Sequence, residues 1–311
     1  MELIQIVPRL PPAPEGVGGY AAALAVELRE RLGVESRFVT GAAGADNLGS
    51  SAVLLHYANY GYQARGCPVS LVRGLLSWKR SAAGRRLVTI FHEVYASGPP
   101  WRSSFWTSPL QRRLAAALAR GGDGAITSLE LYAGLIKRLA PGVEVHVSPV
   151  FSTVGEPERV PALSERSRTM VVFGGPGARD RAYGEQREAL EASCRAWGIQ
   201  EVLDIGPALS SVPSHIGNIP VRTLGALPAA EVSRLLLGSF AGFLVYPSAF
   251  LGKSTIFAAY CAHGLLPVQP GEKMDADSAQ ERATAAREWY LRHSLAHQAQ
   301  LFDRLLGGNG A

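Results

Sequence analysis

Two arginines end a glycine-rich stretch near the middle of the chain, where residues 174–181 read GGPGARDR. The stretch follows a short apolar run that predicts a buried strand. Glycines such as Gly175 let a backbone approach a ligand closely, and the guanidinium groups of Arg179 and Arg181 can each hold two phosphate oxygens. This combination is suited to a diphosphate, and the alternative interpretation is a solvated turn.

A second basic stretch lies further along, where residues 246–255 read YPSAFLGKST between a predicted strand and a predicted helix. Lys253, Ser254 and Thr255 stand at the start of that helix, where unpaired N–H groups favour an anion. The letters GKST also match the end of a P-loop. However, Pro247 occupies the place of the first P-loop glycine, and proline is stiff and has no N–H. A P-loop NTPase is therefore a minor alternative.

A glycine cluster, GVGG at residues 16–19, opens the first predicted helix. Gly16, Gly18 and Ala21 match the spacing of a dinucleotide fingerprint, which would predict a dehydrogenase. Two observations oppose that reading. Eight residues separate the first predicted strand from Gly16, and the second predicted strand ends at Thr40 rather than at an acidic residue. A ligand-binding helix start and a plain glycine-rich turn remain open.

The fourth candidate is the sequence FHE, at the end of a predicted strand over residues 87–92. His92 and Glu93 would lie at the carboxyl end of that strand and point into the cleft. A histidine there can bond to a sugar hydroxyl or act as an acid or base near neutral pH. The alternative is a structural histidine with satisfied hydrogen bonds.

These loops need a scaffold, and the apolar pattern supplies one. Short apolar runs alternate with helical patterns along residues 3–147 and again along residues 169–269, which predicts parallel sheets covered on both faces. Residues 149–168 hold three prolines and many charges with no apolar period, and they are the best linker candidate. We expect an α/β protein of two doubly wound Rossmann-like domains facing each other across a cleft. Ligands then bind beyond the carboxyl ends of the strands.

Composition excludes several other classes of protein. The chain has 311 residues, of which 47% are hydrophobic and 18% charged, so it can build a core and is not disordered. No apolar run is long enough for a membrane-spanning helix. Three scattered cysteines encode neither a disulfide framework nor a zinc site, and we expect a cytoplasmic location.

The basic excess of +5 lies in the first half of the chain. Residues 1–152 carry a net charge of +6 and residues 153–311 a net charge of −1. This asymmetry is either ordinary surface charge or a face toward an anionic partner. Aromatic and basic residues mix between Trp101 and Arg113, which raises contact with an anionic membrane as a further expectation. No RNA-binding motif is found, and no nucleic-acid partner is expected.

Taken together, the markers resemble the retaining nucleotide-sugar glycosyltransferases of the GT-B fold, family 4. The similarity covers nearly the full length. Its markers in this chain are PPAPEGVGGYAAALAVELRERLGV, FHE, ITSLELYAGLIKRL, VVFGGPGARDR, LGALPAAEVSRLL and FLVYPSAFLGKSTIFAAYCAHGLLPV.

The resemblance implies a division of labour between domains. Residues 1–152 would hold the acceptor and residues 153–286 the nucleotide-sugar, and residues 287–311 would form a helix crossing back to the first domain. It assigns catalytic roles to His92, Arg179 and Lys253. The phosphate and donor side would consist of Gly18, Gly19, Gly175, Arg181, Ser254 and Thr255, and the acceptor side of Glu93, His56 and Tyr60. Similar enzymes use no metal and no cofactor, because basic groups and helix ends neutralise the leaving diphosphate.

One departure from the family pattern concerns the last motif. The family carries two glutamates there, and this chain has Leu251 and Ala259 at those positions. The expected function is transfer of a hexose from a nucleotide-diphosphate sugar to a lipid-linked, polysaccharide or other hydroxyl acceptor, at the inner face of the cytoplasmic membrane. A catalytically inactive GT-B-like binding module is the alternative.

Overall fold

The computed structural model describes residues 2–11, 16–41, 48–49, 52–272 and 278–307, and these form two compact units. Unit 1 comprises residues 1–149 together with 295–311, and unit 2 comprises residues 150–294. Each unit has its own six-stranded sheet, so the α/β class and the two-sheet GT-B architecture are confirmed. The cleft expected between the halves stays a prediction.

The sheet of unit 1 is parallel throughout, with the order β2-β1-β3-β4-β5-β6. Its central strands are buried on both faces, which explains their continuous apolar sequences. The strands are β1 (Glu2–Val7), β2 (Glu35–Thr40), β3 (Ala52–Tyr57), β4 (Arg86–Phe91), β5 (Gly124–Thr127) and β6 (Val145–Val147).

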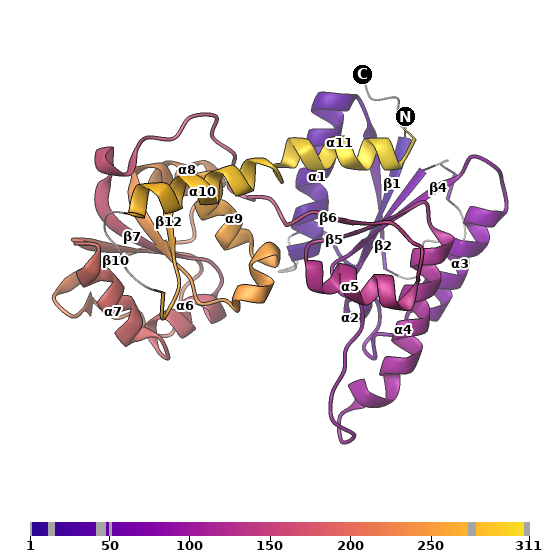
Figure 1. Cartoon of the computed structure of the whole chain (residues 1–311), viewed down its shortest axis with the longest axis horizontal. Helices are drawn as coiled ribbons and strands as arrows, with labels where there is room; N and C mark the ends of the chain where they lie inside the picture. Colours follow the sequence, from indigo (N-terminus) through magenta and orange to yellow (C-terminus); the bar gives the residue numbers. More distant parts are fainter. Residues whose placement is uncertain (1, 12–15, 42–47, 50–51, 273–277, 308–311) are drawn as a thin grey trace. The chain divides into compact units, whose positions relative to one another are not determined.

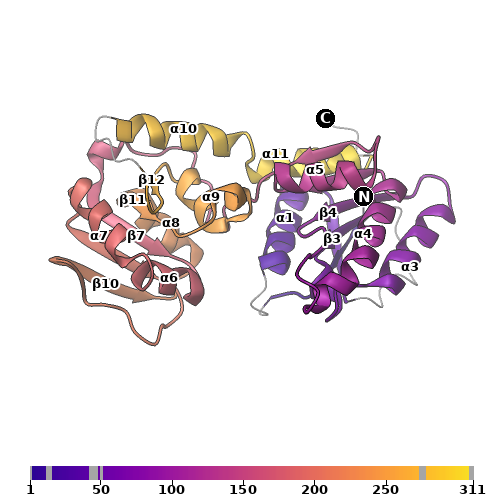
Figure 2. The same ribbon diagram turned by 60° about the horizontal axis from the view of Figure 1, so that its bottom comes forward.

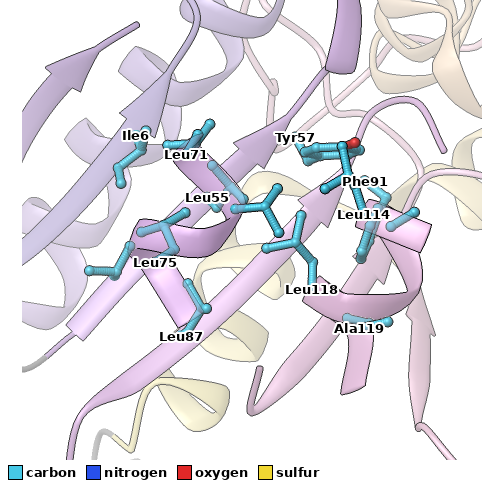
Figure 3. Close-up of a cluster of buried hydrophobic side chains, with 14 of the residues drawn as sticks. Ile6, Leu55, Tyr57, Leu71, Leu75, Leu87, Phe91, Leu114, Leu118 and Ala119 are labelled. Atoms are coloured by element: carbon cyan, nitrogen blue, oxygen red, sulfur yellow. The ribbon is translucent and has the colours of Figure 1, made fainter. Parts of the chain in front are cut away.

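Helices cover both faces of this sheet because the chain moves from β1 to β2 in one direction and from β3 to β6 in the other. The helices are α1 (Gly16–Leu32), α2 (Asn59–Tyr62), α3 (Val69–Arg80), α4 (Ser103–Gly121), α5 (Glu130–Leu139) and the C-terminal α11 (Leu295–Leu305). Helix α11 packs against α1, while α3, α4 and α5 pack in sequence (Figure 1). Leu71, Leu75, Leu114 and Leu118 fill the core between α3, α4 and the strands (Figure 3).

Unit 2 repeats the plan with the strand order β12-β11-β7-β8-β10-β9. Its strands are β7 (Ser167–Phe173), β8 (Glu201–Ile205), β9 (His215–Ile216), β10 (Ile219–Gly225), β11 (Ser239–Phe243) and β12 (Leu266–Val268). Its α-helices are α6 (Pro176–Tyr183), α7 (Arg187–Ala196), α8 (Ala229–Gly238), α9 (Thr255–Ala262) and α10 (Ala279–Leu291), seen from a second side in Figure 2. The antiparallel pairing of β9 with β10 was not expected from the sequence.

The proline-rich stretch after residue 149 is not a free linker. From Val150 onward it belongs to unit 2, and two arginines fasten it there. Arg166 is buried and donates to the carbonyls of Pro161, Ser239 and His263. Arg287 of α10 donates to the carbonyls of Pro157 and Glu158. The stretch therefore forms an ordered cover on unit 2.

The end of the chain divides between the units. Helix α10 belongs to unit 2 and ends at Leu291, and α11 begins at Leu295 in unit 1. The single return helix expected over residues 287–311 is thus two helices, and only the second lies in unit 1. No helix within the described ranges is both long and apolar enough to cross a membrane.

His263 caps the C-terminal end of α9 inside unit 2 and makes folding sensitive to acid. Its Nδ1–H donates to the Ala259 carbonyl over 2.8 Å, and its Nε2 accepts from the Ser233 hydroxyl over 2.8 Å. Burial lowers the pKa of His263 from 6.5 to about 4. As pH falls below 6.5, the unfolded chain takes up the proton first, so stability is complete above that pH and declines toward pH 4.

We expect the variant His263→Gln to flatten this decline. The slope of unfolding free energy against pH should fall by about 1.4 kcal/mol per pH unit near pH 5. Urea denaturation at a series of pH values measures it, with His215→Gln as the control because His215 is exposed. An unchanged slope in His263→Gln would show that this histidine is not held neutral.

Candidate functional site

Two histidines meet at the carboxyl edge of the unit 1 sheet. His56 lies on β3 and is fully buried, and His92 directly follows β4. Their rings stack at 5.5 Å, with His56 Nδ1 3.2 Å from His92 Nε2. Because His56 is fully buried, the direct acceptor contact expected for it does not fit this arrangement.

The hydrogen bonds around His56 determine which nitrogen of His92 carries a proton. The Gln5 amide donates to Ser36 Oγ over 2.9 Å, so its carbonyl oxygen accepts from His56 Nε2 over 2.9 Å. Burial, with His92 nearby, lowers the pKa of His56 well below its ordinary value, so His56 is neutral. Its bare Nδ1 then accepts from the Nε2–H of His92. The Nε2–H of His92 is thereby committed to His56.

The C-terminal helix supports the same pair of rings. Tyr20 of α1 meets both histidines edge-on, with ring distances of 5.9 Å to His56 and 5.3 Å to His92. Its hydroxyl donates to Gln298 of α11, whose amide donates in turn to the Pro149 carbonyl. The return of α11 to unit 1 thus helps to position His92.

We expect nitrogen NMR of the histidine rings to show this tautomer order. His56 should be protonated on Nε2 alone across the whole range in which the protein stays folded. In Gln5→Leu the acceptor for that proton is lost, and His56 should shift to a mixture of tautomers. Ser36→Ala keeps Gln5 but removes the acceptor of its amide N–H, and it should have a smaller effect than Gln5→Leu. A doubly protonated His56 at neutral pH would contradict the assignment.

The other acceptor-side candidates differ in their surroundings. Tyr60 on α2 is exposed, and its hydroxyl accepts from Gln111 over 3.2 Å. The Glu93 Oε2 atom and the Tyr57 hydroxyl are both buried, and neither has a hydrogen-bond partner among the described residues. Glu93 also contributes to raising the pKa of Tyr57 after the larger effect of burial. Glu93 and Tyr57 therefore lie close enough to interact electrostatically near the carboxyl end of β4.

Gly18 and Gly19 have different reasons to be glycine. A Cβ at Gly18 would lie 2.4 Å from the Arg9 carbonyl oxygen, so this glycine allows the loop after β1 to cross α1. A Cβ at Gly19 would meet nothing within 4 Å. Gly18 is therefore required for packing, and Gly19 is the better candidate for a ligand contact. The loop between them and β1 includes residues 12–15, which lie outside the described residues.

Replacing Gly18 or Gly19 by alanine should therefore have opposite effects on the stability of the protein. We expect Gly18→Ala to lower the free energy of unfolding by about 1–3 kcal/mol through overpacking. Gly19→Ala should raise it by about 0.5–1 kcal/mol, because alanine is the better helix former. Thermal unfolding of both variants measures the difference. Equal effects would contradict the distinction.

In unit 2 the stretch after β7 is a helix rather than a loop. Gly175 is the N-cap of α6 and Pro176 occupies its first position, a favoured arrangement. Arg179 is consequently turned inward and is completely buried. Its guanidinium donates to both carboxylate oxygens of Asp204, over 2.8 and 2.5 Å, and to the Pro207 carbonyl. The predicted contact of Arg179 with a diphosphate does not fit this arrangement.

Arg181, by contrast, is exposed and lines a cavity of about 930 Å³. The cavity lies beyond the carboxyl ends of β11 and β12 and is formed by unit 2 alone. It combines a cation, two aromatic rings, two amides and a carboxylate. Its lining residues are Arg181, Gln186, Val245, Tyr246, Pro247, Ser248, Phe250, Gln269, Pro270, Gly271 and Glu272.

Sequence reasoning missed most of this cavity. Gln269 donates to the Tyr246 carbonyl over 2.5 Å, and Glu272 pairs with Arg282 of α10 over 2.5 Å. Both residues follow the last strand, β12, so the rule that ligands bind beyond strand ends could have found them. Glu272 is also the carboxylate of this cavity, whereas Leu251 and Ala259, at the positions of the family glutamates, pack in the core around α8 and α9.

The GKST motif provides the N-cap residue of α9. Ser254 is buried, and its hydroxyl accepts from the Phe257 N–H over 3.1 Å as the N-cap. Residues Ser248–Lys253 form a 3₁₀ helix, which opposes the P-loop alternative because a P-loop wraps a phosphate with open backbone N–H groups. Lys253 and Thr255 are half-buried beside it and are not among the cavity-lining residues.

Metal-binding side chains do not gather in the part of the chain that the structure describes. No group of three His, Cys, Asp or Glu residues there is arranged to hold a metal ion. The expectation that no metal is needed stays a prediction.

Two Rossmann-like units, each with candidate residues beyond its strand ends, define the class of the chain as the GT-B fold. No family model matches the sequence, and no curated protein matches it. Solved glycosyltransferase structures do match the fold. A structure named trehalose-6-phosphate from E. coli bound with UDP-2-fluoro glucose is 10% identical, with a TM-score of 0.57 over 99% of both chains.

Two further structures are similar over nearly the whole chain. An alpha-glucosyltransferase in complex with UDP-glucose and DNA is 12% identical, with a TM-score of 0.51 over 98% of this chain and 94% of that one. WaaG, a glycosyltransferase involved in lipopolysaccharide biosynthesis, is 13% identical, with a TM-score of 0.50 over 98% of this chain and 100% of that one. At these identities the likeness establishes the fold alone.

Proposed function

We propose that the protein is a glycosyltransferase that takes a hexose from a uridine diphosphate sugar. The observation that carries the proposal is the unit 2 cavity with Arg181, Tyr246, Gln269 and Glu272 beyond the carboxyl ends of its strands. Nucleotides bind at that edge in doubly wound sheets. The choice of uridine is supported by the similar structures, which contain UDP-glucose and UDP-2-fluoro glucose.

Each group in the cavity is suited to one part of the donor. An aromatic ring such as Tyr246 or Phe250 can stack on the base, and the Gln269 amide can bond to its edge. Glu272 can accept from the ribose hydroxyls, in place of the carboxylate that the family carries at the position of Ala259. Arg181 can bind the diphosphate with two donors at once. Arg179 does not contact the donor in this proposal; its buried ion pair with Asp204 holds α6 in place.

The proposed reaction exchanges one bond at the anomeric carbon of the sugar. The bond to the diphosphate oxygen breaks and its electron pair leaves with the nucleotide, while a bond to the acceptor oxygen forms. The acceptor proton passes to the leaving phosphate oxygen on the same face, which gives retention. Arg181 stabilises the leaving charge. We propose that His92 of unit 1 faces the transferred sugar, as the family resemblance implies.

The acceptor proposed is a glycan or lipid-linked hydroxyl, held through Glu93 and Tyr60. Metal-independent transfer, with Lys253 contributing positive charge near the donor, is part of the same proposal. The similar structures include both a DNA complex and an enzyme of lipopolysaccharide biosynthesis, so duplex DNA belongs in the acceptor panel.

Incubation with a panel of radiolabelled nucleotide sugars tests the proposal. We expect slow hydrolysis of one uridine diphosphate sugar without acceptor and faster transfer with the correct acceptor. His92→Ala should lose turnover and keep nucleotide binding. Nucleotide binding without turnover in the wild type would favour the alternative, a GT-B-like binding module. Magnesium-dependent ATP hydrolysis that is lost in Lys253→Ala would instead revive the P-loop NTPase.

A further inference from the structure

One segment of unit 1 contains no acidic residue. Between Glu93 and Asp123 the chain has four arginines and neither aspartate nor glutamate. The same segment contains two tryptophans, Trp101 and Trp106. It comprises the loop after β4 and the helix α4, so its charge is concentrated on one part of the unit.

The aromatic side chains of this segment are directed into solvent. Trp101 is 84% exposed and Trp106 is 72% exposed, and Phe105 and Leu110 nearby are also exposed. Large apolar groups gathered in this way are unusual on a soluble surface and mark an interaction site. In Figure 1 the first turns of α4 and the loop before them extend away from the sheet of unit 1.

Several contacts hold this surface in shape. The Trp106 indole N–H donates to the Pro100 carbonyl over 2.9 Å, and its ring meets Phe105 edge-on at 5.2 Å. The guanidinium of Arg112 lies over the Tyr95 ring at 4.4 Å. The rings are therefore ordered before any partner binds, which lowers the entropic cost of binding.

A cavity of about 460 Å³ opens within the same surface, between Phe105, Trp106 and Arg112. Ser108 also lines it, and its hydroxyl is buried with no hydrogen-bond partner among the described residues. A cavity whose lining combines a guanidinium, an unsatisfied hydroxyl and two aromatic rings is suited to a phosphate group attached to an apolar molecule.

We infer that this surface, consisting of Trp101, Arg102, Phe105, Trp106, Leu110 and Arg113, docks on an anionic phospholipid membrane. Tryptophan is the side chain that prefers the membrane interface, because one part of its ring is apolar and its N–H is polar. The arginines supply charge complementarity to lipid phosphates without a competing acidic group. The inference does not depend on the proposed sugar transfer.

Vesicle co-sedimentation with the full chain tests it. Wild-type protein should bind vesicles of about one part phosphatidylglycerol to three parts phosphatidylcholine and not pure phosphatidylcholine, with binding that weakens as salt rises. Tryptophan fluorescence should be quenched by brominated lipid acyl chains. Failure to bind the anionic vesicles, or equal binding to both vesicle types, would overturn the inference.

Paired variants locate the contact. Arg102→Gln with Arg113→Gln should weaken partitioning about 30-fold, because each arginine contributes about fivefold. Trp101→Ala with Trp106→Ala should weaken it about tenfold or more and abolish the quenching. Val26→Ala with Arg29→Gln is the matched control, since both lie exposed on α1, on the opposite face of the sheet. Membrane docking would be contradicted if the arginine and tryptophan variants bound anionic vesicles as strongly as the wild type. It would also be contradicted if the wild type bound duplex DNA but no vesicles and these variants lost the DNA binding.

Discussion

Replacing Asp204 by alanine is expected to lower the free energy of unfolding of unit 2 by about 3–5 kcal/mol. Asp204 and Arg179 are both completely buried, and the carboxylate accepts from two guanidinium nitrogens. It also accepts from the Tyr183 hydroxyl over 2.9 Å. The variant leaves the Arg179 charge buried without its counterion, and this causes most of the loss.

Chemical denaturation of wild type, Asp204→Ala and Glu191→Ala measures this effect. Glu191 pairs with Arg195 on the surface of α7, so its removal should cost less than about 1 kcal/mol. The double variant Asp204→Leu with Arg179→Leu should recover much of the lost stability, because it removes both charges. A loss in Asp204→Ala no greater than that in Glu191→Ala would show that the ion pair is exposed to water.

The second large effect is expected on sugar transfer. Arg181→Ala should reduce kcat/KM about 10²–10³-fold while the fold stays intact, because one charged donor to the leaving diphosphate is lost. Arg187→Ala is the matched control, since Arg187 is an exposed arginine nearby on α7 that donates to the His215 carbonyl and does not line the cavity. Steady-state kinetics with the donor identified from the panel provides the measurement.

The separate effects of Arg181→Ala on kcat and on KM distinguish two explanations for a reduced kcat/KM. A rise in KM with unchanged kcat would assign Arg181 to binding of the donor in its ground state alone. A loss in kcat would assign it to the leaving charge. No change in either parameter would remove Arg181, and with it the unit 2 cavity, from the reaction.

The alternation of strands and helices could be predicted from the sequence because buried parallel strands are apolar on both faces. The run at β3, AVLLHY, is an example, and every residue of this strand is buried. The division into two units followed from the same pattern. The stretch after residue 149 misled the prediction, because its prolines and charges are typical of a linker while Arg166 and Arg287 fasten it to unit 2 through backbone carbonyls. Such long-range bonds leave no local pattern.

The site was only partly predictable, and Arg179 shows why. Arg179 and Arg181 have the same chemistry, but residues two apart on a helix point about 200° away from each other. Once α6 begins at Pro176, one arginine is buried on Asp204 and the other lines the cavity. A loop would have allowed both to contact a phosphate. The burial of His56 on β3 was likewise not visible in its spacing from His92.

Titration of UDP into the 311-residue chain by calorimetry tests the central claim most directly. Wild-type protein should bind UDP, Arg181→Ala should bind it at least about tenfold more weakly, and Arg187→Ala should bind it like the wild type. Glu272→Gln should lose affinity for UDP and much less for inorganic diphosphate, which lacks the ribose. Absence of UDP binding by the wild type, or equal affinity in Arg181→Ala and Arg187→Ala, would contradict the assignment of the unit 2 cavity as the donor site.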